Sequence, residues 1–279
     1  MWEHLPDADL EREYSPSSLA PGFQTTVASY TTLSRRVLAT HASCQLPYGS
    51  HGDEYAILLE AKAPARPVMV VYLHGGYWQE LSAEDSCFPA AHFLARGIDY
   101  AAVNYTLTPG ATVGGIVGQC ARALATLARA RPDHAMVLAG SSAGAHLAAM
   151  MTMLDWRVLG ERPPLLCGVL LLSGIYDLRP LVRTYINAPL GLDTASAWAL
   201  SPLSLAPQTR APTLICWGER ETAEFKRQSR AYAAHLADHA NPTHTLEVPG
   251  RDHFDILFDI GQRDTVLGQA VSILLGDNT

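Results

Sequence analysis

The sequence predicts an α/β protein with a doubly wound, mostly parallel sheet. Strand-like and helix-like segments alternate along the chain without internal repeats, which is typical of this class. The expected strands are short, nearly unbroken apolar runs, as in sheets that helices cover on both faces. Hydrophobic residues make up 48% of the chain, which is enough to cover a large sheet. We expect a single domain over residues 1–279.

The expected elements follow one another as strand, crossover helix and strand. Strands are predicted near Ala56–Ala61, Val68–Leu73, Tyr100–Val103, Ala135–Leu138, Gly168–Ser173, Thr213–Trp217 and Thr245–Val248. Helices are predicted at Phe88–Arg96, Val113–Arg131, Ala145–Met153, Ala223–Asp238 and Ile256–Leu275. Residues 1–50 lack strong strand patterns, and we expect them to extend over the mouth of the site. Residues 178–207, interrupted by Pro180, Pro189 and Pro202, are expected to form a small cap or lid.

The strongest motif is Gly-Ser-Ser-Ala-Gly at residues 140–144. It lies between a predicted strand and a predicted helix, and the frame Gly-x-Ser-x-Gly in that context is a nucleophile elbow. The two glycines allow a sharp turn and a close approach of strand and helix. Ser142 stands at the centre of the frame and is the predicted nucleophile, whereas Ser141 is not.

An oxyanion hole is predicted from the segment His74-Gly75-Gly76, which directly follows the strand Val68–Leu73. Backbone N–H groups of Gly75, Gly76 and Ala143 are the expected donors to the reacting oxygen. Tyr77 and Trp78 come next in the chain. We expect their rings to line the acyl side of the site and to keep it small.

The catalytic base and acid are expected in the order Ser, acid, His. Of the 11 histidines, His253 lies in the loop after the last predicted strand, where the base belongs. The acid should follow the strand Thr213–Trp217, and there Glu219 and Glu221 qualify about equally on position alone. Asp177, one strand earlier, is a less usual alternative.

Other histidines do not indicate a metal site. His235 and His239 lie one helical turn apart but lack the Glu of a His-Glu-x-x-His motif. His146 is expected to pack beside the elbow. We therefore predict no metal and no cofactor.

Further motifs are distributed over most of the chain. They are Leu10–Pro16, His74–Trp78, Asn104-Tyr105, Gly140–Ala148, Ser173–Leu178, Glu224–Ser229 and Asp252–Asp255. The elbow and His-Gly-Gly are common to a whole superfamily, whereas Ser-Gly-Ile-Tyr-Asp-Leu and Glu-Phe-x-Arg-Gln-Ser are much more specific. On these motifs the chain resembles the kynurenine formamidase (arylformamidase) family of the α/β-hydrolase superfamily.

The resemblance implies an α/β-hydrolase fold and hydrolysis of N-formyl-L-kynurenine to kynurenine and formate through a formyl-Ser142 intermediate. It also favours Glu221 as the acid, three residues before the Glu-Phe-x-Arg-Gln-Ser segment. Relatives commonly carry Asp there, so this chain departs by one methylene. Tyr105 and Tyr176 are candidates to stack on the aryl ring of the substrate.

Composition narrows the class of partner. A formal charge of −7 gives no reason to expect nucleic acid or an anionic membrane, and a small-molecule substrate is expected. The first nine residues are acidic, so we expect no signal peptide, and the apolar runs are too short to span a membrane. Five cysteines lie far apart, which favours a reduced, cytoplasmic protein. The sequence leaves a homodimer open.

Two other functions stay open. The same residues would serve a broader small-acyl carboxylesterase or a carbamate or amide hydrolase. A catalytically silent binding protein of this fold would be expected to lose the serine, the histidine or the elbow glycines, and all are present.

Overall fold

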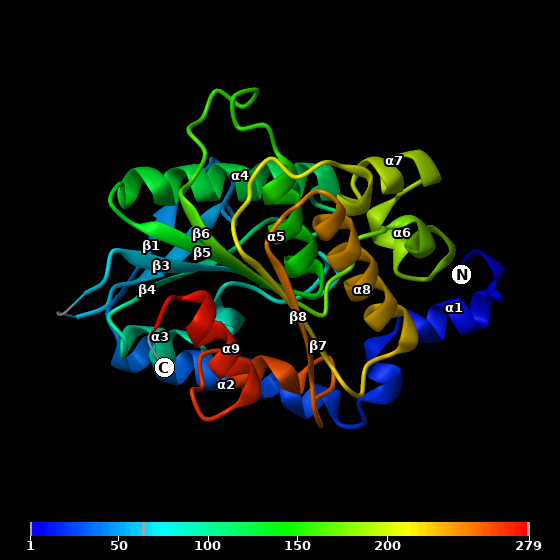
Figure 1. Ribbon diagram of the computed structural model, residues 1–279, viewed down its shortest axis with the longest axis horizontal. Helices are drawn as coiled ribbons and strands as arrows, with labels where there is room; N and C mark the ends of the chain where they lie inside the picture. Colours follow the sequence, from blue (N-terminus) through cyan, green and yellow to red (C-terminus); the bar gives the residue numbers. More distant parts are fainter. Residues whose placement is uncertain (1, 63–64, 278–279) are drawn as a thin grey trace.

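An eight-stranded sheet forms the centre of the computed structural model, which describes residues 2–62 and 65–277 (Figure 1). The strands lie in the order β1-β2-β4-β3-β5-β6-β7-β8. Their bounds are Ser43–Pro47 (β1), Tyr55–Leu59 (β2), Val68–Leu73 (β3), Asp99–Val103 (β4), Ala135–Ser141 (β5), Leu166–Leu172 (β6), Thr213–Gly218 (β7) and Thr243–Val248 (β8). Neighbours from β4 to β8 pair in parallel, whereas β2 is antiparallel to β1 and β4. The predicted α/β class and mostly parallel sheet are confirmed.

Helices cover both faces of this sheet. They are α1 (Asp7–Glu13), α2 (Phe23–Thr40), α3 (Ala90–Leu94), α4 (Val113–Ala130), α5 (Ala143–Met153), α6 (Asn187–Leu190), α7 (Thr194–Ala199), α8 (Ala223–Asp238) and α9 (Val266–Leu274). In β3, Met69, Val71 and Leu73 belong to the core under α4, α5 and α8. Val70 and Tyr72 belong to the core on the opposite side, with α2, α3 and α9 (Figure 1). The alternation of side chains along each strand therefore builds two apolar layers.

The N-terminal segment contains elements for which the sequence shows no strong pattern. β1 is an exposed edge strand and lacks the apolar run that marks a buried strand. α2 is rich in Ser and Thr, and its buried residues are Tyr30, Ser34 and Val37. Figure 1 shows α1 and α2 along one side of the molecule, and α1 contacts α8. That residues 1–50 form an extension over the mouth of the site stays a prediction.

The single C-terminal helix predicted over Ile256–Leu275 is wrong. The chain forms a 3-10 turn at Asp255–Asp259, leaves it, and begins α9 only at Val266. Gly261 interrupts the helix because its φ is +80°, a left-handed conformation. The Thr265 hydroxyl then accepts a hydrogen bond from the Gly268 N–H at 3.0 Å and caps the new helix.

Residues 178–207 connect β6 to β7 and interrupt the alternation of strands and crossover helices. They hold α6, α7 and two 3-10 turns, Arg179–Arg183 and Pro202–Ser204. The role of this segment as a cap stays a prediction. The predicted domain also includes residues 1, 63–64 and 278–279, which lie outside the described residues.

The N-terminus of α5 approaches β3 so closely that a side chain would not fit. A Cβ at Gly144 would lie 2.0 Å from the carbonyl oxygen of Leu73, and one at Gly140 would lie 2.2 Å from the carbonyl oxygen of Gly144. Both obstacles are backbone atoms, which cannot rotate away. Glycine at both positions is therefore a packing requirement of the turn between β5 and α5.

Gly144→Ala should lower the free energy of unfolding by about 3 kcal/mol or more, because β3 or α5 must move to admit the methyl group. A matched control is Gly118→Ala within α4, where the nearest atom to the new Cβ is Nη1 of Arg122 at 3.7 Å. That change should stabilise the protein by roughly 0.5–1 kcal/mol. Urea unfolding of both variants measures the difference, and equal stabilities would contradict the close approach.

Candidate active site

Ser142 lies at the sharp turn between β5 and α5 and has the backbone angles φ 54° and ψ −119°. This conformation is strained for a residue with a side chain and persists only where surrounding contacts hold it. The Ser142 N–H donates to the carbonyl of Leu172 at 2.8 Å, and the Ser142 carbonyl accepts from the His146 N–H at 3.1 Å. The turn is thus tied to β6 on one side and to α5 on the other.

The structure brings His253 and Glu221 together from two different loops. Nδ1 of His253 lies 3.0 Å from Oε2 of Glu221, and both side chains are buried. The second carboxylate oxygen, Oε1, accepts hydrogen bonds from the Ser173 hydroxyl and the Gly218 N–H, each at 2.6 Å. Three donors therefore hold this carboxylate, and Nε2 of His253 keeps no hydrogen-bond partner among the described residues.

The other candidate acids have different partners. Glu219 is exposed and accepts a hydrogen bond from the Gly250 N–H at 2.7 Å. Asp177 forms a two-pronged pair with the guanidinium of Arg179, at 2.9 and 2.7 Å. Neither carboxylate contacts His253. Glu219 and Glu221 are equally good candidates on their position in the sequence, but in the structure only Glu221 contacts His253.

The backbone of the His-Gly-Gly segment faces the serine. A Cβ at Gly75 would lie 3.0 Å from the Ser141 carbonyl oxygen and 3.3 Å from the Ser142 Cβ, so a side chain there would be in tight contact with the elbow. Gly76 has φ +97°. Among the described residues, no group accepts a hydrogen bond from the N–H of Gly75, Gly76 or Ala143. Unpaired backbone donors beside a nucleophilic serine are what an oxyanion hole needs. The assignment of these three groups to an oxyanion hole stays a prediction.

His74 supports this segment from behind. Burial lowers the pKa of His74 to about 4, so the imidazole is neutral near pH 7. The His74 ring stacks on the Tyr105 ring with centroids 4.1 Å apart, and its Nδ1 lies 2.9 Å from the Gly75 carbonyl oxygen. The Tyr105 hydroxyl donates a hydrogen bond to the His74 carbonyl at 2.9 Å. This supporting role of His74 is not among the predicted ones, although a histidine directly before two glycines is a visible signal in the sequence.

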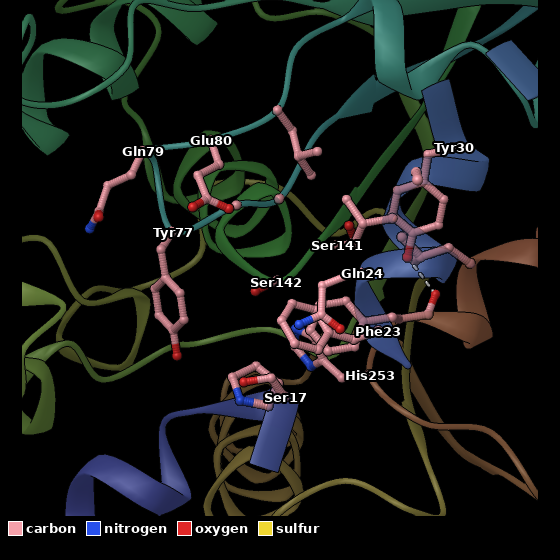
Figure 2. A pocket seen from close by; sticks show the side chains of 18 of the residues that line it. Ser17, Phe23, Gln24, Tyr30, Tyr77, Gln79, Glu80, Ser141, Ser142 and His253 are labelled. Carbon is pink, nitrogen blue, oxygen red and sulfur yellow. Dashed lines mark hydrogen bonds between the residues drawn. The ribbon is translucent and has the colours of Figure 1, made fainter. Parts of the chain in front are cut away.

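A cavity of about 560 Å³ opens beside Ser142 and His253 (Figure 2). Segments far apart in the sequence meet around it. Its walls come from the N-terminal segment (Pro16, Ser17, Phe23, Gln24, Val27, Ala28, Tyr30, Thr31), the glycine loop (Gly75–Tyr77, Gln79–Leu81), the elbow (Ser141, Ser142), the segment after β6 (Tyr185, Ile186) and the histidine loop (His253, Phe254, Leu257). This volume suits a small aromatic ligand.

Of the four aromatic residues predicted to contact substrate, only Tyr77 lines this cavity. Its hydroxyl donates to the Tyr14 carbonyl at 2.6 Å, which fixes the ring against the N-terminal segment. The expectation is corrected for the other three, which are buried elsewhere. Trp78 packs edge-on against His146, Tyr105 stacks on His74, and Tyr176 stacks on Tyr232. Phe23, Tyr30 and Phe254 line the cavity instead, and no sequence pattern marks them.

Two further histidines, His146 and His235, pack against neighbouring backbone. Burial lowers the pKa of His146 to about 4, and its Nε2 lies 2.8 Å from the Leu200 carbonyl oxygen. Nε2 of His235 lies 2.8 Å from the Leu205 carbonyl oxygen. Within residues 2–62 and 65–277, no group of three or more His, Cys, Asp or Glu could hold a metal ion. In the same part of the chain no helix is long and apolar enough to cross a membrane.

Comparison with known proteins identifies the fold class. A family model described as the α/β-hydrolase fold matches residues 70–256. A solved structure of a proposed thioesterase from Silicibacter sp. TM1040 has a TM-score of 0.85 and 23% identity and covers 94% of this chain and 98% of its own. The chain is therefore an α/β-hydrolase.

Two curated relatives define the branch of that superfamily. The kynurenine formamidase of Salmo salar is 32% identical over 99% of this chain and 98% of its own length, and that of Danio rerio is 30% identical over 99% and 98%. The chain belongs to the kynurenine formamidase family.

Proposed function

We propose that this chain is a serine hydrolase that cleaves an aryl formamide such as N-formyl-L-kynurenine to the arylamine and formate. The observation that carries the proposal is the pairing of His253 with Glu221 on the cavity that Ser142 also lines. Membership of the kynurenine formamidase family supports the substrate class.

In the proposed reaction, Ser142 Oγ attacks the formyl carbon while Nε2 of His253 takes its proton. Glu221 keeps the proton of His253 on Nδ1 and stabilises the imidazolium that forms. The N–H groups of Gly75, Gly76 and Ala143 receive the negative charge on the formyl oxygen, and one such donor is typically worth about 2.7–4 kcal/mol of barrier height.

The second half of the reaction returns the enzyme to its starting state. His253 gives its proton to the leaving arylamine nitrogen, and the C–N bond breaks to leave a formyl ester on Ser142. A water molecule, deprotonated by His253, then attacks that ester. His253 returns this proton to Ser142 Oγ as the ester C–O bond breaks, which releases formic acid; it ionises to formate, and Ser142 is free again. No step requires a group outside the chain and water.

A broader small-acyl carboxylesterase or a carbamate or amide hydrolase would use the same residues. This second function is supported by a relative from Mycobacterium tuberculosis that is named as an esterase and is 25% identical over 83% of this chain. A silent binding protein is disfavoured because Ser142, His253 and Glu221 are all retained together.

Assembly and compartment are separate proposals. All five cysteines are free in the part of the chain that is described, which supports a reducing, cytoplasmic environment. A homodimer stays a prediction.

Ser142→Ala should abolish turnover, because the attacking oxygen is removed, while thermal unfolding stays near that of the parent protein. Ser141→Ala is the matched control. Its hydroxyl accepts from Tyr72 at 3.0 Å, and its loss should cost about 1 kcal/mol of stability while most turnover is retained. A serine-directed covalent reagent followed by mass spectrometry should label Ser142, and labelling of Ser142→Ala at the same rate would refute the assignment.

Glu221→Gln should lower kcat by about 10⁴-fold, the effect of losing the acid that holds the histidine tautomer. Glu219→Gln, two residues away in the same loop, should change kcat little because its partner is the Gly250 N–H. Steady-state kinetics on both variants measures the difference. Similar losses in the two variants would argue against Glu221 as the acid.

The acyl side should accept formyl and acetyl groups and reject long acyl chains, because Tyr77 directly follows the proposed oxyanion glycines and is held by Tyr14. The measurement is kcat/KM for N-formyl-L-kynurenine and for phenyl esters of increasing acyl length. Efficient formamide turnover with a falling ester series is the expected result. Rates that rise from acetate to octanoate without N-formyl-L-kynurenine turnover would favour the esterase reading.

A further inference from the structure

The wall of the cavity beside Ser142 contains an acidic side chain and no basic Lys or Arg side chain among the described residues. Glu80 contributes this carboxylate. The chain as a whole carries a formal charge of −7. A charged ligand in this cavity therefore meets one fixed negative charge and no fixed positive one.

Glu80 is attached closely to the proposed oxyanion loop. Its N–H donates to the Gly76 carbonyl at 3.0 Å, and a Cβ at Gly76 would lie 2.3 Å from the Glu80 carbonyl oxygen. Figure 2 shows Glu80 on the same side as Tyr77, with Ser142 between them and His253. The backbone of Glu80 is thus held in a fixed relation to the reacting centre.

The carboxylate itself is free for a ligand. Glu80 is exposed, and its side chain forms no ion pair or hydrogen bond with any residue that the structure describes. Gln79, its neighbour, is instead held by a hydrogen bond to the Ile186 carbonyl at 3.0 Å. The other polar groups at the wall, such as Gln24, Ser17 and Tyr185, are neutral and can hydrogen-bond a carboxylate without supplying a counter-charge.

We propose that Glu80 is a specificity-determining residue that binds a cationic group on the substrate side chain, such as the α-ammonium of N-formyl-L-kynurenine. This inference rests on the proposed function, because it takes the same cavity as the substrate site. The cavity then favours aryl formamides with a cationic or zwitterionic side chain over anionic ones of the same size. Charge selection comes from a wall residue and leaves the reacting groups unchanged.

The test compares two analogues of N-formyl-L-kynurenine, one lacking the carboxylate (a cation) and one lacking the ammonium (an anion). The readout is the ratio of kcat/KM for the cation to that for the anion within each variant, so a general loss of activity cancels. The ratio should exceed one in the parent protein. Glu80→Gln should lower it roughly fivefold or more, as expected when an exposed attraction and an exposed repulsion are both removed, and Glu80→Lys should invert it.

Asp133→Asn is the matched control for net charge, because Asp133 is exposed near the opposite end of β5 and does not line the cavity. It should leave the ratio unchanged. Raising the ionic strength to about 1 M, where the Debye length is about 3 Å, should bring the parent ratio toward one. A ratio that is the same in parent, Glu80→Gln and Glu80→Lys would overturn the proposal.

Binding separates this proposal from the proposed function. Dissociation constants of both analogues are measured by calorimetry on Ser142→Ala protein, with and without Glu80→Lys, and need no turnover. If the cation binds more tightly and Glu80→Lys reverses the order, charge selection stands even when the parent protein hydrolyses neither formamide and the proposed function fails. If both formamides are hydrolysed and the order does not change, the formamidase stands and the role of Glu80 is refuted.

Discussion

The contact between the start of α5 and the end of β3 is the constraint on which the site depends. Gly144 lies against the Leu73 carbonyl with no room for a side chain, and a Cβ at Gly75 would be in tight contact with Ser142, at 3.3 Å from its Cβ. The N–H groups of Gly75 and Ala143 are consequently held beside the serine by main-chain packing. Groups positioned in this way need no reorganisation when charge develops on a substrate, which is the physical basis of electrostatic preorganisation.

Backbone strain is concentrated around the same contact. In the described part of the chain, six residues other than glycine have positive φ. Five of them lie in the loop after β3 (Tyr77, Trp78, Leu81), at the elbow (Ser142) or directly after β6 (Ser173). Each such conformation costs on the order of 1–3 kcal/mol and must be held by its surroundings. The Trp78 carbonyl accepts from the Thr108 N–H at 2.8 Å, and the Ser173 N–H donates to the Cys216 carbonyl at 2.8 Å. Backbone hydrogen bonds from the sheet and the loops therefore stabilise these strained residues.

The N-terminal segment joins the cavity wall to the loop that carries the acid. The Thr222 hydroxyl, next to Glu221, donates to the Glu13 carbonyl at 2.6 Å. The Tyr14 hydroxyl donates to Glu224 at 2.9 Å, while the Tyr14 carbonyl accepts from Tyr77. A movement of this segment would thus disturb the wall and the acid loop together. The same contacts give a structural meaning to the motif at Leu10–Pro16, which lies far from the elbow in sequence.

The sequence by itself determined the parallel strands, the elbow at Ser142, the glycine loop and the loop of His253, because each is written in a local pattern of apolar runs, glycines and order along the chain. Only the tertiary structure separated Glu221 from Glu219 by contact, since the two lie two residues apart and differ in the direction of their side chains. Only the tertiary structure shows that Phe23, Tyr30 and Phe254 line the cavity, where Trp78, Tyr105 and Tyr176 were expected. It also shows that the predicted C-terminal helix is interrupted at Gly261. These outcomes depend on which distant segments pack together, and that information is distributed over the whole chain.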